Sequence, residues 1–111
     1  MNPSDFLPLA PRDLLILSAL VRGPLHGYGI VRAVGEQSDV ILDPANLYRA
    51  LRRMRADGWV TESESGAAEE RKRTFALTAT GQAILRAEVA RLDALLRRLA
   101  SPGALAPEGA R

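Results

Sequence analysis

Basic and hydrogen-bonding side chains gather in one segment, LDPANLYRALRRMRADGWV at residues 42–60, which predicts a helix beginning at about Pro44. Successive helical residues turn by about 100°, which puts the apolar side chains of this helix on one stripe facing a core. The opposite surface offers an amide, a phenol and guanidinium groups, which can bind base edges and phosphates. Its candidate DNA-binding residues are Ala45, Asn46, Tyr48, Arg49 and Arg52. The alternative is a solvated basic face with Tyr48 packed sideways on a neighbour.

A second basic cluster follows at Arg71, Lys72 and Arg73. It lies on the returning strand of a predicted hairpin, because WVTESES and RKRTFAL have a β-type pattern on either side of the loop GAAEE. A winged helix-turn-helix inserts its recognition helix into the major groove and places its hairpin, the wing, beside the DNA backbone. Basic residues are needed in both places, so the two clusters together predict a DNA-binding surface.

Helix signals place the remaining elements. A first helix begins at Pro11, and a short second helix, HGYGIVRAVGEQS, follows the turn GPL. Asp43 is a natural N-cap for the third helix, which Gly58 closes, and Thr78 caps a long fourth helix. The predicted fold is mainly α with one β-hairpin: a winged helix-turn-helix followed by a long C-terminal dimerisation helix.

These elements set the expected domain boundaries. Prolines in residues 1–10 predict a flexible N-terminal arm, although its apolar side chains could still dock on another surface. Residues 11–78 form the expected DNA-binding domain, and residues 79–99 form the dimerisation helix. Residues 100–111 contain several prolines and glycines and are expected to be a disordered tail.

The fourth helix carries an apolar seam with spacings of four and three residues, as in helices that pair. The first three helices are expected to cover one another's apolar faces, so the seam predicts a symmetric homodimer. Folding back on its own domain is the alternative. The expected dimer-interface residues are Leu85, Val89, Leu92, Leu96 and Leu99. In such a dimer, two recognition helices one DNA turn apart would read a palindromic site.

Composition argues against several other functions. The chain has 111 residues, enough for one domain, and a formal net charge of only +2. It has no cysteine and one histidine, His26, so thiolate and His-rich metal sites are excluded and general-base catalysis is hard to assemble. We therefore expect no enzyme, metal or cofactor. The run LLILSALV is too short to span a membrane and lacks the basic start of a signal peptide, which predicts a cytoplasmic protein.

Three blocks of the sequence, GPLHGYGI, LDPANLYRALRRMRADGWV and RKRTFALTATG, resemble the PadR family of bacterial transcriptional regulators. That family typically shows GPLHGYEI, T-LYP-L-RLE and RKYYRLT–G patterns at these places. The resemblance runs in the same order from roughly Leu14 to Leu99, and the single C-terminal helix is similar to the smaller PadR subfamily. It implies a winged helix-turn-helix dimer that binds an inverted-repeat DNA operator, usually as a repressor, with relief by a small-molecule effector as a further possibility.

The sequence departs from the family pattern at several positions. Arg49 replaces a frequent proline, Asn46 a threonine or serine, and Gly29 a glutamate. Glu69 and Glu70 at the wing tip would repel phosphate, so the tip itself is not expected to touch DNA. Some small PadR relatives stack flat drugs on an aromatic residue of the last helix. That helix has no aromatic residue here, so only a simpler apolar cavity stays open as an effector site.

Three further residues carry specific expectations. His26 is expected to cap or turn the second helix, with a phosphate contact as the alternative. Tyr28 is expected to pack in the core, with a DNA backbone contact as the alternative, and Trp59 to pack in the core rather than stack on a ligand. The leading hypothesis is a dimeric DNA-binding repressor, and the rival is a winged-helix module that binds another protein. Phosphate binding weakens steeply with salt, which separates the two hypotheses.

Overall fold

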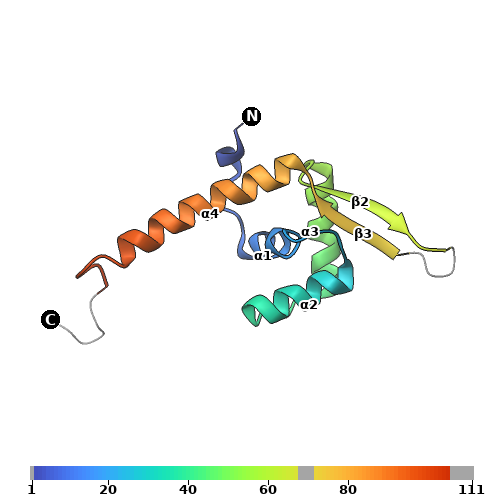
Figure 1. The fold of residues 1–111 in the computed structure, drawn as a ribbon, viewed down its shortest axis with the longest axis horizontal. Helices are drawn as coiled ribbons and strands as arrows, with labels where there is room; N and C mark the ends of the chain where they lie inside the picture. Colours follow the sequence, from blue (N-terminus) through green and yellow to red (C-terminus); the bar gives the residue numbers. More distant parts are fainter. Residues whose placement is uncertain (1, 68–71, 106–111) are drawn as a thin grey trace.

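A computed structural model describes residues 2–67 and 72–105 of the chain (Figure 1). Over these residues the protein is mainly helical, with a small three-stranded antiparallel sheet. In chain order the elements are η1 (Pro3–Phe6), α1 (Pro11–Ala19), β1 (Leu25–His26), α2 (Gly27–Ser38), α3 (Pro44–Ala56), β2 (Val60–Ser65), β3 (Lys72–Leu77) and α4 (Ala79–Leu99). The architecture confirms the predicted fold class, a winged helix-turn-helix with a long helix after it.

The core lies where α1, α2 and α3 meet the sheet and the first half of α4. Its most deeply buried apolar side chains include Ile16, Leu17, Ile30, Leu47, Met54 and Ile84. The start of α3 is fixed as predicted, because Asp43 Oδ2 accepts a hydrogen bond from Asn46 N at 3.2 Å and Pro44 takes the first helical position. The chain leaves α3 through Gly58, whose φ of 81° favours glycine.

The sheet has the strand order β1-β3-β2, so the predicted two-stranded hairpin gains a third strand. The additional strand is β1, in which Leu25 pairs with Phe75 and His26 with Thr74. A strand of two residues is too short for an alternation of apolar and polar side chains. The sequence analysis therefore predicted only a turn before α2. Pairing with β3 fixes the amino end of α2 beside the wing.

The N-terminal segment, residues 2–10, is more ordered than the irregular arm expected from its prolines. Residues 3–6 form η1, and the Phe6 and Trp59 rings meet edge to face with centroids 5.5 Å apart. Leu9 is buried, and its backbone N–H donates to Glu88 Oε2 at 2.8 Å. This segment therefore packs along α4. The buried partner, Glu88, is distant in sequence, so local composition gave no sign of it.

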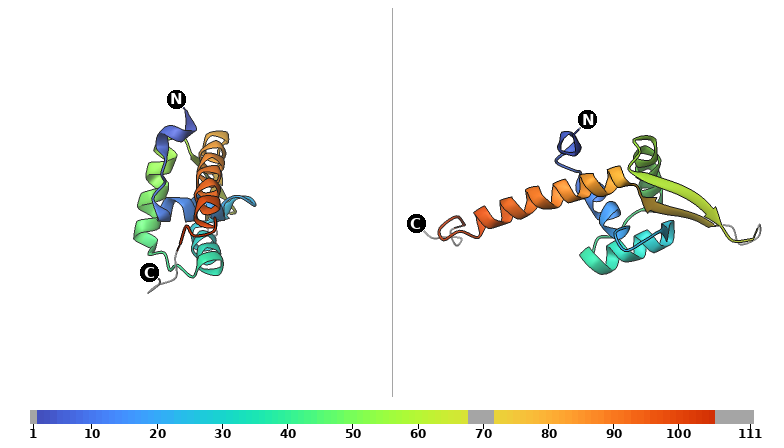
Figure 2. Two further views of the ribbon diagram at one scale, coloured as in Figure 1. Left: turned by 90° about the vertical axis from the view of Figure 1, so that its left-hand side faces the viewer. Right: turned by 45° about the horizontal axis from the view of Figure 1, so that its top comes forward.

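The two halves of α4 have different surroundings. Thr78 caps the helix as predicted, with its hydroxyl accepting a hydrogen bond from Gly81 N at 3.0 Å. The first half packs against α1 and η1, and the second half projects away from the domain (Figures 1 and 2). Leu85 is only 7% exposed and belongs to the domain core, which corrects its expected place in the dimer seam. The expectation failed because α1 and η1, rather than a second chain, cover this part of the helix.

The rest of the seam has no such cover within the chain. Val89, Leu96 and Leu99 are exposed, while Leu92 is half-buried. Residues 100–105 continue from α4 in turns, and residues 106–111 of the expected disordered tail lie outside the described residues. In the described ranges, no helix is long and apolar enough to cross a membrane.

Candidate nucleic-acid interface

Helix α3 presents most of its predicted binding residues on one outer surface. Leu47, Leu51 and Met54 are buried, which confirms the apolar stripe and the orientation of the helix. On the other side, the residues Ala45, Tyr48, Arg49 and Arg52 are exposed and Asn46 is half-buried. The predicted amide, phenol and guanidinium groups are therefore brought together near the amino end of α3.

Two of these side chains are joined to each other. Arg49 Nη2 donates a hydrogen bond to Asn46 Oδ1, one helical turn earlier. The bond occupies the acceptor oxygen of the amide and leaves N–H donors on both residues. In this arrangement the pair offers donors toward the outer surface, a match for the acceptors O6 and N7 of guanine.

The later arginines of α3 are tied to the domain instead. Arg53 Nη2 lies 2.5 Å from Asp13 Oδ2, whose side chain is largely buried on α1. Arg55 Nη1 lies 3.4 Å from Glu62 Oε2 on β2. Arg52 forms no ion pair with any residue in the described part of the chain. The partners of Arg53 and Arg55 therefore both come from other elements of the fold.

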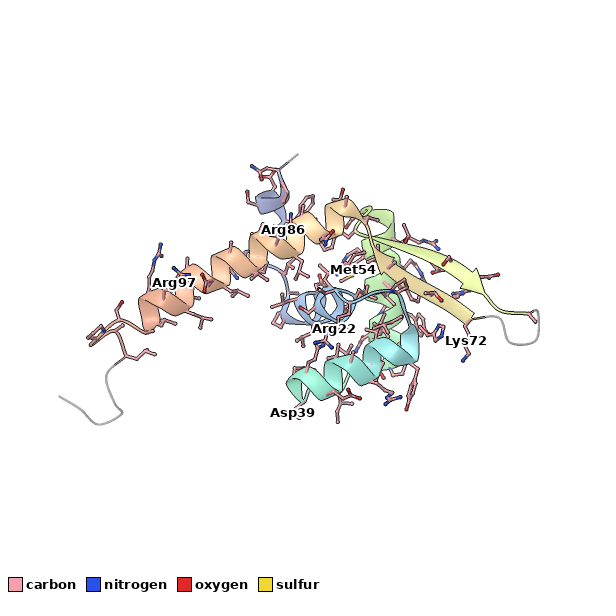
Figure 3. The ribbon with its side chains drawn as sticks, viewed as in Figure 1. Arg22, Asp39, Met54, Lys72, Arg86 and Arg97 are labelled. Atoms are coloured by element: carbon pink, nitrogen blue, oxygen red, sulfur yellow. The ribbon has the colours of Figure 1, made fainter. Side chains whose placement is uncertain are left out.

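The wing contributes a second group of cations. Lys72 and Arg73 are exposed at the start of β3, and Arg73 Nε lies 3.8 Å from Glu62 Oε2. The Lys72 side chain projects from the wing on the side where α2 lies (Figure 3). The third predicted cation of this cluster, Arg71, lies outside the described residues, as do the acids Glu69 and Glu70 of the wing tip.

Tyr28 corrects one of the sequence expectations, since its side chain is 72% exposed rather than packed in the core. Helical periodicity already indicated that Tyr28 faces away from the core. At about 100° per residue, Tyr28 is turned about 200° from Ile30 and about 240° from Val34, and these two residues mark the buried side of α2.

His26 does take the N-cap position of α2, but its side chain makes no capping hydrogen bond with the described residues. Its Nδ1 lies 3.4 Å from Thr74 Oγ1 on β3. The expectation for Trp59 holds, because its ring is buried.

Tyr48 also packs between α3, the wing and the start of α2. Its ring lies 6.3 Å from that of Phe75, centroid to centroid, and it borders the amino end of α2. A Cβ atom added at Gly27 would overlap the Tyr48 hydroxyl. A larger residue at position 27 would therefore require the Tyr48 side chain to move.

The family model described as "Transcriptional regulator PadR-like family" matches residues 16–87, which contain α2, α3 and the wing. This chain belongs to the PadR-like family. The family is one of transcriptional regulators, and the winged helix of this chain is shared with a solved PadR family regulator.

Individual relatives agree with this membership. The PadR-like chain is 41% identical over 76 residues, or 68% of its length, to an uncharacterized transposon protein of Streptomyces fradiae, of which it spans only 21%. A PadR family transcription regulator of Clostridium difficile superposes with a TM-score of 0.72 at 26% identity, covering 78% of this chain and 92% of that one. Bacillus subtilis PadR, solved in complex with operator DNA, shares the fold with a TM-score of 0.65 at 23% identity, covering 91% of this chain and 54% of that one.

Within residues 2–67 and 72–105, no group of three or more His, Cys, Asp or Glu side chains could hold a metal ion. The described surface that gathers the predicted site residues is the one formed by α3, the amino end of α2 and the wing.

Proposed function

We propose that this PadR-like regulator acts as a homodimeric repressor that binds an inverted-repeat operator. The observation that carries the proposal is the Asn46–Arg49 pair at the amino end of α3, beside the exposed side chain of Arg52. A recognition helix enters the major groove by its amino end, so the pair meets base edges and Arg52 meets flanking phosphates. Ala45 between them leaves room for the base pairs, and Tyr48 contacts a phosphate or a thymine methyl group.

The wing supplies affinity rather than sequence preference in this proposal. Lys72 and Arg73 are exposed on a strand beside α3, where phosphates are the nearest DNA groups. Arg71 joins them by its place in the sequence. Each phosphate neutralised releases counterions and contributes about 0.9 to the log–log slope of affinity against salt.

Dimerisation is proposed through the outer half of α4. Val89, Leu92, Leu96 and Leu99 place apolar surface on a helix that leaves the domain, and a second copy would cover it. Leu85 is left out of this interface because it is buried in its own domain. An effector held in such an interface would be a compact apolar molecule, because α4 has no aromatic side chain on which a flat molecule could stack.

Selection of bound sites from random DNA tests the proposal. We expect enrichment of a two-fold symmetric sequence, with half-sites about 10 base pairs apart. Replacing Lys72 and Arg73 with alanine should weaken selected and random DNA alike and lower the salt slope by up to about two. The rival function, a winged-helix module for protein binding, predicts no enriched sequence. An enriched sequence together with a loss of base preference in the wing variant would contradict the role given to the wing.

A further inference from the structure

A cleft of about 370 Å³ lies between η1 and the start of α4, at the place where α3 ends. Its lining is mostly apolar and consists there of Pro3, Phe6, Ala79, Ala83 and Ile84. The polar lining residues are Asp57 and Thr80, and none of the lining residues belongs to the proposed DNA-binding surface. Small-molecule sites typically enclose roughly 300–1,000 Å³ and combine an apolar lining with a few polar groups.

We propose that this cleft binds a small organic cation, with the apolar body of the molecule between Phe6 and Ile84 and its ammonium group beside Asp57. The inference goes beyond the proposed function and does not depend on DNA binding. It assigns a ligand class to a face of the molecule that the operator contacts leave unused.

The first argument is the charge of the cleft. Among the described residues that line it, Asp57 is the one that carries a charge. Its carboxylate is exposed and forms no ion pair with any residue in the described ranges. The arginines in the last turn of α3, Arg53 and Arg55, do not neutralise it, because each pairs with an acid on another element. A ligand cation can therefore take the place of a counter-ion.

The helix ends at the cleft do not reverse this preference. Asp57 is the C-cap of α3, and α4 begins on the other side of the cleft at Ala79. The negative end of one helix dipole and the positive end of the other are thus close together and offset each other. Arg86, further along α4, is exposed and is not among the lining residues. The full charge of Asp57 therefore decides the sign of the ligand.

The second argument is that the walls are fixed before any molecule binds. The Phe6 and Trp59 rings meet edge to face with centroids 5.5 Å apart, and Phe6 stays half-buried, with part of its ring exposed. At the end of the same segment, the Leu9 N–H donates to Glu88 at 2.8 Å. The apolar body of a ligand thus finds a preformed surface, which lowers the entropy cost of binding.

Trp59 provides the readout, because it is the only tryptophan of the chain and it packs directly on Phe6. The probes are 2-phenylethylammonium, its neutral analogue 2-phenylethanol and the anion 3-phenylpropanoate. We expect the ammonium to change Trp59 fluorescence saturably at millimolar concentration. The alcohol should bind about threefold to tenfold more weakly, since it lacks the charge, and the anion more weakly still.

Two aspartate variants test the role of the charge. Asp57→Asn should lower the affinity for the ammonium about threefold to tenfold and leave that for the alcohol unchanged. Asp39→Asn is the matched control, because Asp39 is also an exposed C-cap, at the end of α2 and away from the cleft (Figure 3). Neither carboxylate forms a hydrogen bond with a described residue, so both variants should keep the parent's thermal unfolding.

A third variant tests the location. Ala83→Leu fills part of the cleft and should weaken the ammonium and the alcohol together, with thermal unfolding as the check that the fold is intact. The comparison of Asp57→Asn with Asp39→Asn stands whether or not this variant folds.

The inference is overturned if the ammonium and the alcohol bind the parent equally, or if Asp39→Asn weakens the ammonium as much as Asp57→Asn. It is also overturned if a folded Ala83→Leu binds like the parent, which would place the probe elsewhere. No binding of any probe at millimolar concentration, as expected if a second copy covers the cleft, overturns it too. No DNA is present in these titrations, so their failure leaves the proposed function standing.

Discussion

Each arginine of α3 has different neighbours, and these neighbours assign its role. Arg53 is held by the largely buried Asp13, and Arg55 by Glu62, so both join α3 to other elements. Arg49 is joined to Asn46 on the outer surface, and Arg52 is exposed there. Arg49 and Arg52 are therefore the two for which we propose DNA contacts, Arg49 with bases and Arg52 with phosphate.

Arg49→Ala and Arg52→Ala should have different effects on binding. Removing Arg49 loses the guanine contact, so we expect a relaxed preference at one position of each half-site and a loss of about 1–3 kcal/mol per contact on the best sequence. Removing Arg52 should weaken all sequences similarly and lower the salt slope by about 0.9. Site selection with both variants beside the parent measures this. If Arg49→Ala kept the full base preference and lost only general affinity, the roles would be wrongly assigned.

At the scale of elements, Glu88 connects the N-terminal segment to α4. Its carboxylate is 1% exposed and accepts hydrogen bonds from Arg91 of the same helix and from the Leu9 N–H. The Arg91 hydrogen bond holds the pKa of Glu88 below its ordinary value of 4.5, with help from the Leu9 N–H and against the desolvation caused by burial. The charged form is thus the one that the fold stabilises.

Glu88→Gln tests how much the stability of the fold depends on the charge of this carboxylate. A carboxyl whose pKa is lower in the folded state adds stability above its unfolded pKa, and that stability is lost as the pH falls through the folded pKa. The variant should be less stable than the parent at neutral pH. The difference should shrink as the pH falls from about 4.5 through the lowered pKa of folded Glu88, below which the parent's carboxyl is neutral as well. Denaturant unfolding at pH 7 and pH 3, by far-ultraviolet circular dichroism, gives the comparison. Glu36→Gln, at an exposed helical position, is the control. If Glu88→Gln lost the same stability at both pH values, the charge of the Glu88 carboxylate would not be the source of the stabilisation.

Two helical glycines offer a second prediction at this scale. A Cβ at Gly81 of α4 would overlap the backbone carbonyl oxygen of Trp59, whereas at Gly35 of α2 it would meet only Val40 O at 3.9 Å. We expect Gly81→Ala to destabilise the fold by about 1–3 kcal/mol through steric strain. Gly35→Ala should stabilise it by about 0.5–1 kcal/mol, because alanine is the better helix former. Chemical denaturation tests both; a stable Gly81→Ala variant would mean that α4 does not pack on Trp59 as described.

At the scale of the whole molecule, the outer half of α4 is the surface through which we propose that the protein dimerises. Leu96 is 63% exposed and Val89 is 54% exposed, so charge at these positions costs the isolated domain little. Val89→Glu with Leu96→Glu should give a folded monomer that loses operator affinity, since two half-sites need two recognition helices. Leu85→Glu, a change within the core, should instead unfold the domain. Sedimentation equilibrium at micromolar concentration, with circular dichroism, separates these results, and a monomeric parent protein would refute the dimer.

The helices and the wing could be predicted from local signals. Asp43 and Thr78 as caps, Pro44 at the first turn and the apolar stripe of α3 act within a few residues of themselves, so their effect is visible in the sequence. The same periodicity correctly identified which side of α3 faces outward. The exposed positions of Arg49 and Arg52 followed from it directly.

Long-range contacts decided the rest. The pairing of β1 with β3, the Leu9–Glu88 hydrogen bond and the Arg53–Asp13 ion pair each join residues that are far apart in the chain. The packing of the elements decides which acid pairs with each arginine of α3. It also decides which half of α4 is covered by other elements of the same chain. The sequence by itself determined the four helices α1 to α4, the hairpin, their order and the outward face of α3, because these depend on neighbours in the chain. Only the tertiary structure placed Leu85 in the core and Asp13 beside Arg53, because those positions depend on neighbours in space.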